Sequence, residues 1–230
     1  KLIEQYPDAG LYQTHFNFID GKGEYIRPCI KMKKIYDMHS LVEAMLQHTI
    51  EITATGFMMR STDYDAVGGI PDYPNLLYAD SELWIELTRK NQLAVAEKTC
   101  YEFRFHIENT SKSAGERRLI AFERLVDYFV SLKESDPRVA ELVEHNGYYF
   151  LKNYALGSCH KLIYVPRENR ENVTMDKILS SAESCAGKLL PEKSFYPRQL
   201  TGVKLAKIID SNTVLRSLFL FYKGFKKRTF

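Results

Sequence analysis

The chain has few of the features that mark several large classes of protein. Its four cysteines form no C-x-x-C pair and lie at long, irregular spacings, a pattern that suits neither a zinc site nor a dense disulfide scaffold. No run of 18 or more apolar residues is present that could cross a bilayer. Internal repeats and low-complexity segments are absent as well. These absences favour a cytoplasmic protein with reduced, buried thiols at Cys29, Cys100, Cys159 and Cys185.

The composition is that of an ordinary globular protein. Apolar residues make up 45% of the 230 residues and charged residues 27%, which is enough apolar surface for a large core. A chain of this length forms one large domain or two small ones.

Positive charge is concentrated at the carboxyl end. Residues 198–230 contain eight Lys or Arg and one Asp, although the whole chain has a net charge of only +3. A basic tail on an acidic body favours an anionic partner, either a membrane surface or a phosphate-bearing ligand. The apolar run L-R-S-L-F-L-F-Y precedes the basic residues Lys223, Lys226, Lys227 and Arg228. Residues 215–230 therefore suit either a helix lying on anionic lipid or a core helix with a solvated end.

Strand and helix patterns alternate up to about residue 110. Aromatic and β-branched residues mark strands, apolar residues at helical spacing mark helices, and Gly21 and Gly23 mark a turn. The expected strands are 10–19, a short extension ending at Pro28, 50–59 and 93–105; the expected helices are 36–49, 61–66 and 80–90. This alternation predicts an α/β layer.

After residue 113 the pattern is helical throughout. The expected helices are 115–133, 137–145, 148–163, 173–186 and 200–223, and the polar stretch 166–172 is the best linker candidate. We therefore expect an α/β domain over residues 1–112 and a helical region over residues 113–230.

Four separated segments carry a resemblance. They read T-A-T-G-F-M-M-R at 53–60, V-G-G-I-P-D-Y at 67–73, Y-A-D-S-E-L-W-I-E-L at 78–87 and F-R-F-H-I-E-N-T-S-K-S at 103–113. In order and spacing they resemble the acceptor-side half of a family 2 glycosyltransferase of the GT-A fold. The resemblance covers about half of the chain. It implies a partial GT-A domain, which is a Rossmann-like mixed sheet of nucleotide-diphospho-sugar transferases, followed here by an α-helical extension.

The resemblance also implies a nucleotide-binding half that is not in this chain. That half, with its own Asp-x-Asp metal motif, is expected to precede residue 1. The sequence Asp63-Tyr64-Asp65 matches Asp-x-Asp literally, but it follows the T-G-F-M-M-R segment instead of ending an early strand. We interpret it as a solvated helix start.

Asp80 is the candidate catalytic base. Inverting sugar transfer needs a carboxylate that takes the proton of the acceptor hydroxyl, and the family places this Asp second in an E-D pair at a helix start. Here the pair is Ala79-Asp80, so only the Asp matches. A plain capping aspartate is the alternative, and Glu82 is the rival carboxylate.

His106 is the candidate metal ligand. In the family a His at this place often completes a divalent metal site that neutralises the diphosphate leaving group, so the resemblance implies Mn²⁺ or Mg²⁺ as the cofactor. A lone His after a strand is otherwise a packed or capping residue.

The family also places small and polar residues around the cleft. By resemblance Thr55, Gly56 and Arg60 flank the sugar cleft, and Asp72 contacts a sugar hydroxyl. The alternatives are a tight strand crossing in the core for the first group and a turn-stabilising role for Asp72.

The expected function is therefore inverting glycosyl transfer, with a nucleotide-sugar donor and a saccharide or lipid-linked acceptor, as in the synthesis of bacterial surface polysaccharide. The expected location is the cytoplasm or the inner face of the membrane, and this chain alone is expected to be inactive. A non-catalytic domain that binds an acceptor or a partner is the second interpretation. Nucleic acid is not an expected partner, because the 15 tyrosines are dispersed and no nucleic-acid-binding signature is present.

Overall fold

The computed structural model describes residues 1–53, 55–105 and 115–226, with side chains in the last helix as far as Tyr222. Over these residues the fold is mixed α/β, as expected. The strands all lie before residue 105, and every described element after it is helical. None of the described helices is both long and apolar enough to cross a membrane.

Two long parallel strands form the centre of the sheet. The β1 strand (Leu11–Ile19) runs beside β5 (Leu93–Arg104), from Leu11 opposite Leu93 to Ile19 opposite Arg104. The remaining described strands pair antiparallel with these two, giving the order β2-β1-β5-β3 with β4 also on β1. Their bounds are Tyr25–Pro28 for β2, Ile35–Tyr36 for β3 and Phe57–Met58 for β4.

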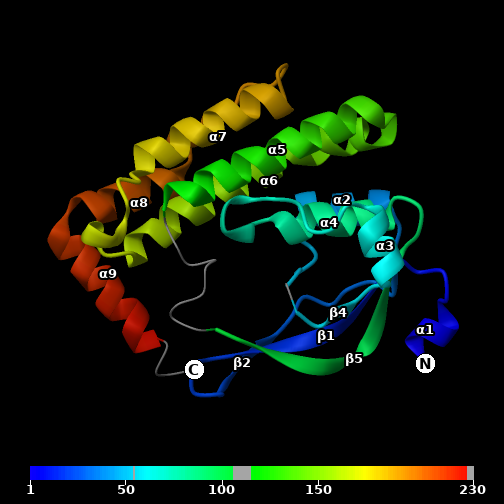
Figure 1. Ribbon diagram of the computed structural model, residues 1–230. Helices are drawn as coiled ribbons and strands as arrows, with labels where there is room; N and C mark the ends of the chain where they lie inside the picture. The colour runs from blue at the N-terminus through cyan, green and yellow to red at the C-terminus, as the bar shows by residue number, and fades with distance from the viewer. Residues whose placement is uncertain (54, 106–114, 227–230) are drawn as a thin grey trace.

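Helices α2 (Met38–Leu46) and α4 (Ala79–Thr88) form a middle layer that covers one face of the sheet (Figure 1). In α4, Leu83 and Trp84 pack toward the sheet, whereas Ile85 belongs to a second core shared with the later helices. Apolar residues on two sides of one helix are typical of a helix packed between two layers. The middle layer therefore joins the sheet core to the helical core.

Three long helices lie on the outer side of the middle layer (Figure 1). They are α5 (Glu116–Ser135), α6 (Pro137–Tyr164) and α7 (Met175–Leu189). Their packed core includes Phe122, Phe129 and Leu151, together with Val42 and Leu46 from α2. The division into 1–112 and 113–230 stays a prediction, and one apolar cluster contains residues from both ranges.

The structure joins two of the predicted helices into one and divides another predicted helix into two. Segments 137–145 and 148–163 form the single helix α6, which continues through Gly147. A Cβ at Gly147 would lie 3.3 Å from the Leu190 side chain, so the glycine lets a neighbouring side chain pack closely. Conversely, segment 200–223 is two helices, α8 (Thr201–Ser211) and α9 (Thr213–Lys226). The break is at Asn212, whose Oδ1 accepts a hydrogen bond from the Leu215 N–H at 3.1 Å and so caps α9.

The predicted strand over 50–59 is also wrong, because only Phe57–Met58 is a strand. The Thr53 hydroxyl donates to the Thr55 carbonyl at 2.9 Å, and Gly56 has φ +77°. These local turns override the strand propensity of the β-branched residues. The predicted helix at 61–66, by contrast, is confirmed as α3 (Ser61–Ala66).

The predicted buried thiols are confirmed for three of the four cysteines. All four are free, and Cys100 is exposed.

The remaining short elements are α1 (Leu2–Gln5) and the 3-10 turns η1 (Pro74–Leu76), η3 (Arg167–Asn169) and η4 (Pro197–Gln199).

The candidate linker at 166–172 is anchored by a buried ion pair. Arg170 is 7% exposed and donates two hydrogen bonds to the Asp210 carboxylate of α8, at 2.8 and 2.6 Å. The hydrogen bonds from Arg170 lower the pKa of Asp210 below its ordinary value. The stabilisation is therefore present above that ordinary value and is lost as the pH falls through the lowered pKa.

Asp210→Asn should lower the free energy of unfolding at neutral pH by about 3 kcal/mol, because it leaves the buried Arg170 unpaired. The matched control is Asp127→Asn, which removes an exposed pair with Lys188 (2.7 Å) and should cost less than about 1 kcal/mol. Urea unfolding measures both. Equal losses for the two variants would contradict the assignment of Arg170–Asp210 as the anchor of this loop.

Candidate functional site

The loop that leads into α4 is held in an unusual backbone conformation. Asn75, Leu76 and Tyr78 have positive φ angles of 55°, 55° and 66°, a region that costs a non-glycine residue about 1 kcal/mol or more. Tyr78 is the N-cap, so α4 begins at Ala79 and Asp80 is its second residue. The sequence pattern predicts Asp80 at or near this cap. Backbone strain of this kind is common at functional sites. The start of α4 is therefore a candidate functional site.

Asp80 is a half-buried residue in the first turn of α4. Its Oδ1 accepts a hydrogen bond from the Ser81 N–H at 3.0 Å. Within the described residues, no Lys, Arg or His forms an ion pair with it at 4.0 Å or less. Burial raises the pKa of Asp80 from 3.8 to about 6, against the smaller opposing effect of the backbone hydrogen bonds. A carboxyl with this pKa exchanges its proton near neutral pH, which is a property of a general base.

Asp80 and Trp84 lie one turn apart on α4 and so share a face of the helix. Trp84 is fully buried, and its ring contacts that of Phe57 edge-on, with the centroids 5.5 Å apart. Phe57 directly follows Gly56 at the start of β4. The Trp84–Phe57 contact therefore joins the middle of α4 to the strand that follows the Thr55–Gly56 turn.

Gly56 lies against the ring of Tyr101 on β5. Its φ is +77°, and a Cβ at this position would lie 2.0 Å from the Tyr101 ring. The Tyr101 hydroxyl is 2.6 Å from the Thr53 hydroxyl, which holds the ring in place. Only glycine combines that φ with so close an approach. The backbone at Thr55 and Gly56 is exposed, so it is open to a ligand.

Glu82, the rival base, is tied to Tyr73. The Tyr73 hydroxyl donates to Glu82 Oε2 at 2.6 Å, and burial together with this bond raises the pKa of Tyr73. The Arg124 guanidinium lies over the Tyr73 ring, 5.0 Å from its centroid, and donates to the backbone carbonyl of Asp72. Glu82 therefore holds the loop before α4, and Asp72 is attached through its backbone.

Arg60 binds the segment that leads into β1, and it follows β4 at the end opposite to Gly56. It donates to the Ala9 carbonyl at 3.0 Å and to Asp63 Oδ2 at 2.6 Å, and also to the Pro7 carbonyl. Its predicted place on the wall of the cleft stays a prediction. Asp63 lies in the first turn of α3, which agrees with the interpretation of Asp63-Tyr64-Asp65 as a helix start.

His106 lies outside the described residues, so the structure says nothing of its predicted role. Within the described ranges, no group of three or more His, Cys, Asp or Glu residues could hold a metal ion. The expected Mn²⁺ or Mg²⁺ stays a prediction.

Sequence reasoning missed two buried polar groups in the layer between the sheet and α4. Gln13 is 0% exposed, and both atoms of its amide lack a hydrogen-bond partner in the described part; the same holds for Trp84 Nε1. Gln13 lies opposite Phe57 in the β1–β4 register. A glutamine inside the apolar strand L-Y-Q-T-H-F was the available signal, because buried polar side chains ordinarily have partners.

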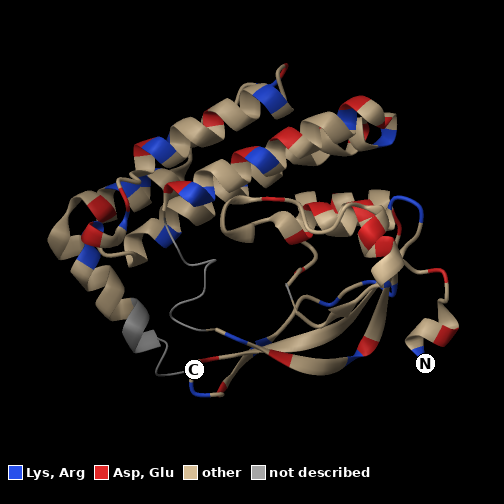
Figure 2. Cartoon of the chain, in the orientation of Figure 1, with Lys and Arg blue, Asp and Glu red and all other residues tan. Residues whose placement is uncertain are grey.

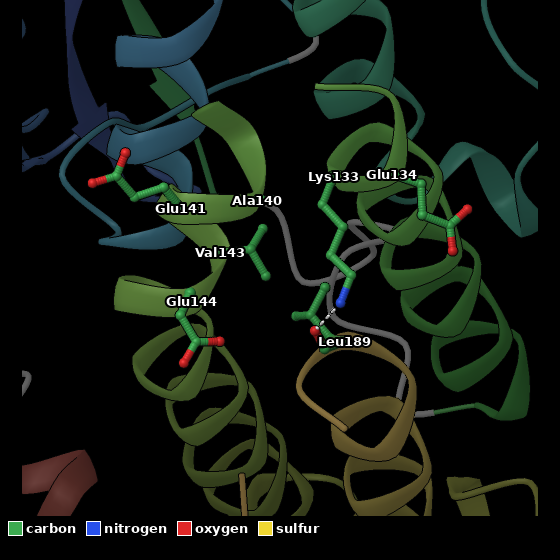
Figure 3. A pocket seen from close by; sticks show the side chains of 7 residues that line it. All are labelled: Lys133, Glu134, Ala140, Glu141, Val143, Glu144 and Leu189. Atoms are coloured by element: carbon green, nitrogen blue, oxygen red, sulfur yellow. Dashed lines mark hydrogen bonds between the residues drawn. The ribbon is translucent and has the colours of Figure 1, made fainter. Parts of the chain in front are cut away.

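A separate pocket of about 420 Å³ lies on the helical side of the molecule, between the C-terminal ends of α5 and α7 and the start of α6 (Figure 3). The Lys133 ammonium group donates to the Leu189 carbonyl at 2.6 Å, so this lysine caps α7. The pocket contains none of the residues discussed above; its lining is Lys133, Glu134, Ala140, Glu141, Val143, Glu144 and Leu189.

No family model, curated protein or solved structure matches the chain. The case for a function therefore rests on the sequence segments and on the geometry at the start of α4.

Ionisation of Asp80 should destabilise the fold. A carboxyl whose folded-state pKa is raised stabilises the protein below its ordinary pKa and loses that contribution as the pH rises through about 6. Asp80→Asn cannot ionise, so its unfolding free energy relative to wild type should rise by about 2 kcal/mol between roughly pH 4 and pH 8. Urea unfolding across this range measures the difference. The control is Asp65→Asn, at an exposed position on α3, which should show a smaller change; a flat difference for Asp80→Asn would contradict the burial argument.

Proposed function

We propose that the chain is the acceptor-side half of an inverting family 2 glycosyltransferase. The observation that carries the proposal is Asp80, a half-buried carboxyl whose pKa is raised to about 6 in the first turn of α4, at the position where the four-segment resemblance expects the base. The proposed donor is a nucleotide-diphosphate sugar. The proposed acceptor is a saccharide or a lipid-linked saccharide of bacterial surface polysaccharide synthesis.

In the proposed reaction the Asp80 carboxylate accepts the proton of an acceptor hydroxyl. That oxygen forms a bond to the anomeric carbon of the donor, while the bond from this carbon to the diphosphate oxygen breaks. The configuration inverts because attack and departure occur on opposite faces. At neutral pH a group with a pKa of about 6 is mostly ionised and is still basic enough to hold the proton. The proton then leaves to solvent, and the nucleoside diphosphate departs with the bonding electron pair.

The exposed turn at Thr55 and Gly56 suits the approach of a sugar. A side chain at position 56 would collide with Tyr101, so this stretch presents backbone without a Cβ in the way. Trp84 and Phe57 connect this turn to the helix that carries Asp80. The proposal places the sugar between these two elements.

Glu82 is the less suitable base. Its carboxylate already accepts the Tyr73 hydroxyl at 2.6 Å, so protonating it would weaken the bond that holds the loop. Asp80 has no comparable side-chain partner in the described part. The metal expected in the complete enzyme would need ligands from the nucleotide-binding half and His106, and none of the proton and bond changes assigned to Asp80 passes through it.

A non-catalytic binding domain is the second candidate, and Ala79 favours it. This alanine stands where the resemblance expects a glutamate, and it is fully buried in the helical core. A glutamate there would bury an additional charge. Under this alternative the Thr55–Gly56 turn binds a saccharide or a partner without transfer.

Asp80→Asn should lower the rate of sugar transfer by a factor of about 10² to 10⁴ and leave donor binding nearly unchanged, because asparagine keeps the shape but cannot take a proton. The assay needs this chain together with the nucleotide-binding half that the proposal requires. Glu82→Gln and Asp65→Asn are the controls, and both should retain most of the activity. Full activity in Asp80→Asn, or a loss of the same size in Glu82→Gln, would contradict the assignment of Asp80 as base.

The 230-residue chain by itself should bind no nucleotide sugar, because the donor's base and ribose have their expected pocket in the other half. Isothermal titration of a nucleotide sugar with Mn²⁺ into the chain measures this directly. Micromolar binding would show that the nucleotide site lies within these residues and would overturn the proposed division.

A further inference from the structure

The last helix of the described chain, α9, carries an exposed apolar face. Val214, Leu218, Phe221 and Tyr222 are 67%, 59%, 75% and 55% exposed, and Leu215 at its margin is 40% exposed. At 100° per residue these positions fall on one side of α9. We call these five residues the α9 apolar face. Single exposed apolar residues are normal, whereas a contiguous row of this kind marks an interaction site.

The exposure is a property of a docked helix, because the other side of α9 is attached to α6. The Arg216 guanidinium donates to the Ile163 carbonyl at 3.0 Å and to the Val165 carbonyl at 2.9 Å. The Phe219 ring contacts the ring of Tyr164, with the centroids 5.8 Å apart. The attachment therefore fixes which side of α9 faces outward, and that side carries the α9 apolar face.

The sequence of α9 and of the residues after it carries charge of one sign. Residues 211–230 contain no Asp or Glu, and Lys223, Lys226, Lys227 and Arg228 lie in or just after α9 in the sequence. In Figure 2 most of the described part of α9 is tan, that is, uncharged. The nearest acid before it in the sequence, Asp210, is paired with Arg170 at 2.6 Å and does not offset the basic residues.

We propose that the α9 apolar face binds an anionic lipid surface. An amphipathic helix lying in the interface buries its apolar side among the acyl chains, and basic residues next to it attract anionic headgroups. This inference does not rest on the proposed glycosyl transfer. It would bring the molecule to a membrane from the helical side, where α8 also exposes Leu205 and Ile208.

Charge favours lipid over a second copy of this chain. A symmetric dimer through α9 would place the same patch of each subunit against its partner. Each subunit would then bring the segment 211–230, which contains basic residues and no Asp or Glu to offset them. An anionic membrane supplies both the apolar layer and the opposite charge.

Vesicle flotation of the 230-residue chain tests the proposal. Vesicles of phosphatidylcholine with phosphatidylserine, in a roughly two-to-one ratio, should carry the protein upward, and vesicles of phosphatidylcholine alone should bind it at least about tenfold more weakly. Leu218→Ser/Phe221→Ser should abolish binding to the mixed vesicles. The matched control replaces Tyr196, which is 60% exposed off this helix, and Tyr196→Ser should bind as wild type does.

A charge series separates attraction to headgroups from burial of the apolar face. Lys227→Glu/Arg228→Glu should weaken binding to the mixed vesicles by more than about tenfold. Lys90→Glu/Lys98→Glu, at two exposed lysines near the end of α4 and in β5, should change it little. Equal binding to both vesicle types, or wild-type binding by Leu218→Ser/Phe221→Ser, would overturn the proposal. So would a dimer, seen by sedimentation velocity, that Leu218→Ser/Phe221→Ser dissociates.

Discussion

Leu83 and Trp84 of α4 pack against the sheet, while Ala79 and Ile85 of the same helix pack into the core of the later helices. In α2, Leu41 and Val42 divide in the same way. Burial of apolar residues on both faces makes these two helices the shared wall of two cores. Removing apolar surface from water is the dominant favourable term in folding. The sheet on one side and α5–α7 on the other therefore depend on this middle layer.

The same two-sided burial sets the chemistry of Asp80. A carboxylate at the first turn of a helix ordinarily gains from the free N–H groups and the helix dipole. At the start of α4 the desolvation of the half-buried carboxyl outweighs the backbone hydrogen bonds, so the pKa rises to about 6. The alanine at position 79 keeps a second charge out of this place. The packing that joins the two cores thus also produces the one carboxyl that we propose as the base.

Strong local patterns made the main strands and several helices predictable. The strands at 10–19 and 93–105 and the helix at 61–66 agree with β1, β5 and α3, because periodicity and turn residues acted in the same direction. The segment at 50–59 failed because side-chain hydrogen bonds from Thr53 and the positive φ of Gly56 decide its course. Two wrong helix predictions are explained by Gly147 and Asn212. One helix continues through Gly147, which packs against Leu190, whereas Asn212 ends one helix and caps the next. The position of Asp80 at a helix start was visible in the sequence, but its burial depends on contacts between distant segments. The same is true of the Tyr73–Glu82 bond and of the isolated amide of Gln13.

The most direct test is a pH titration that follows the NMR signal of the Asp80 carboxyl carbon. The signal is assigned as the one that is missing from the spectrum of Asp80→Asn. We expect a midpoint near pH 6, because desolvation at the start of α4 disfavours the charged form of the carboxyl. A midpoint near the ordinary value of 3.8 would mean that the carboxyl is solvated. In that case both the burial of α4 on two faces at this point and the assignment of Asp80 as a base near neutral pH would be contradicted.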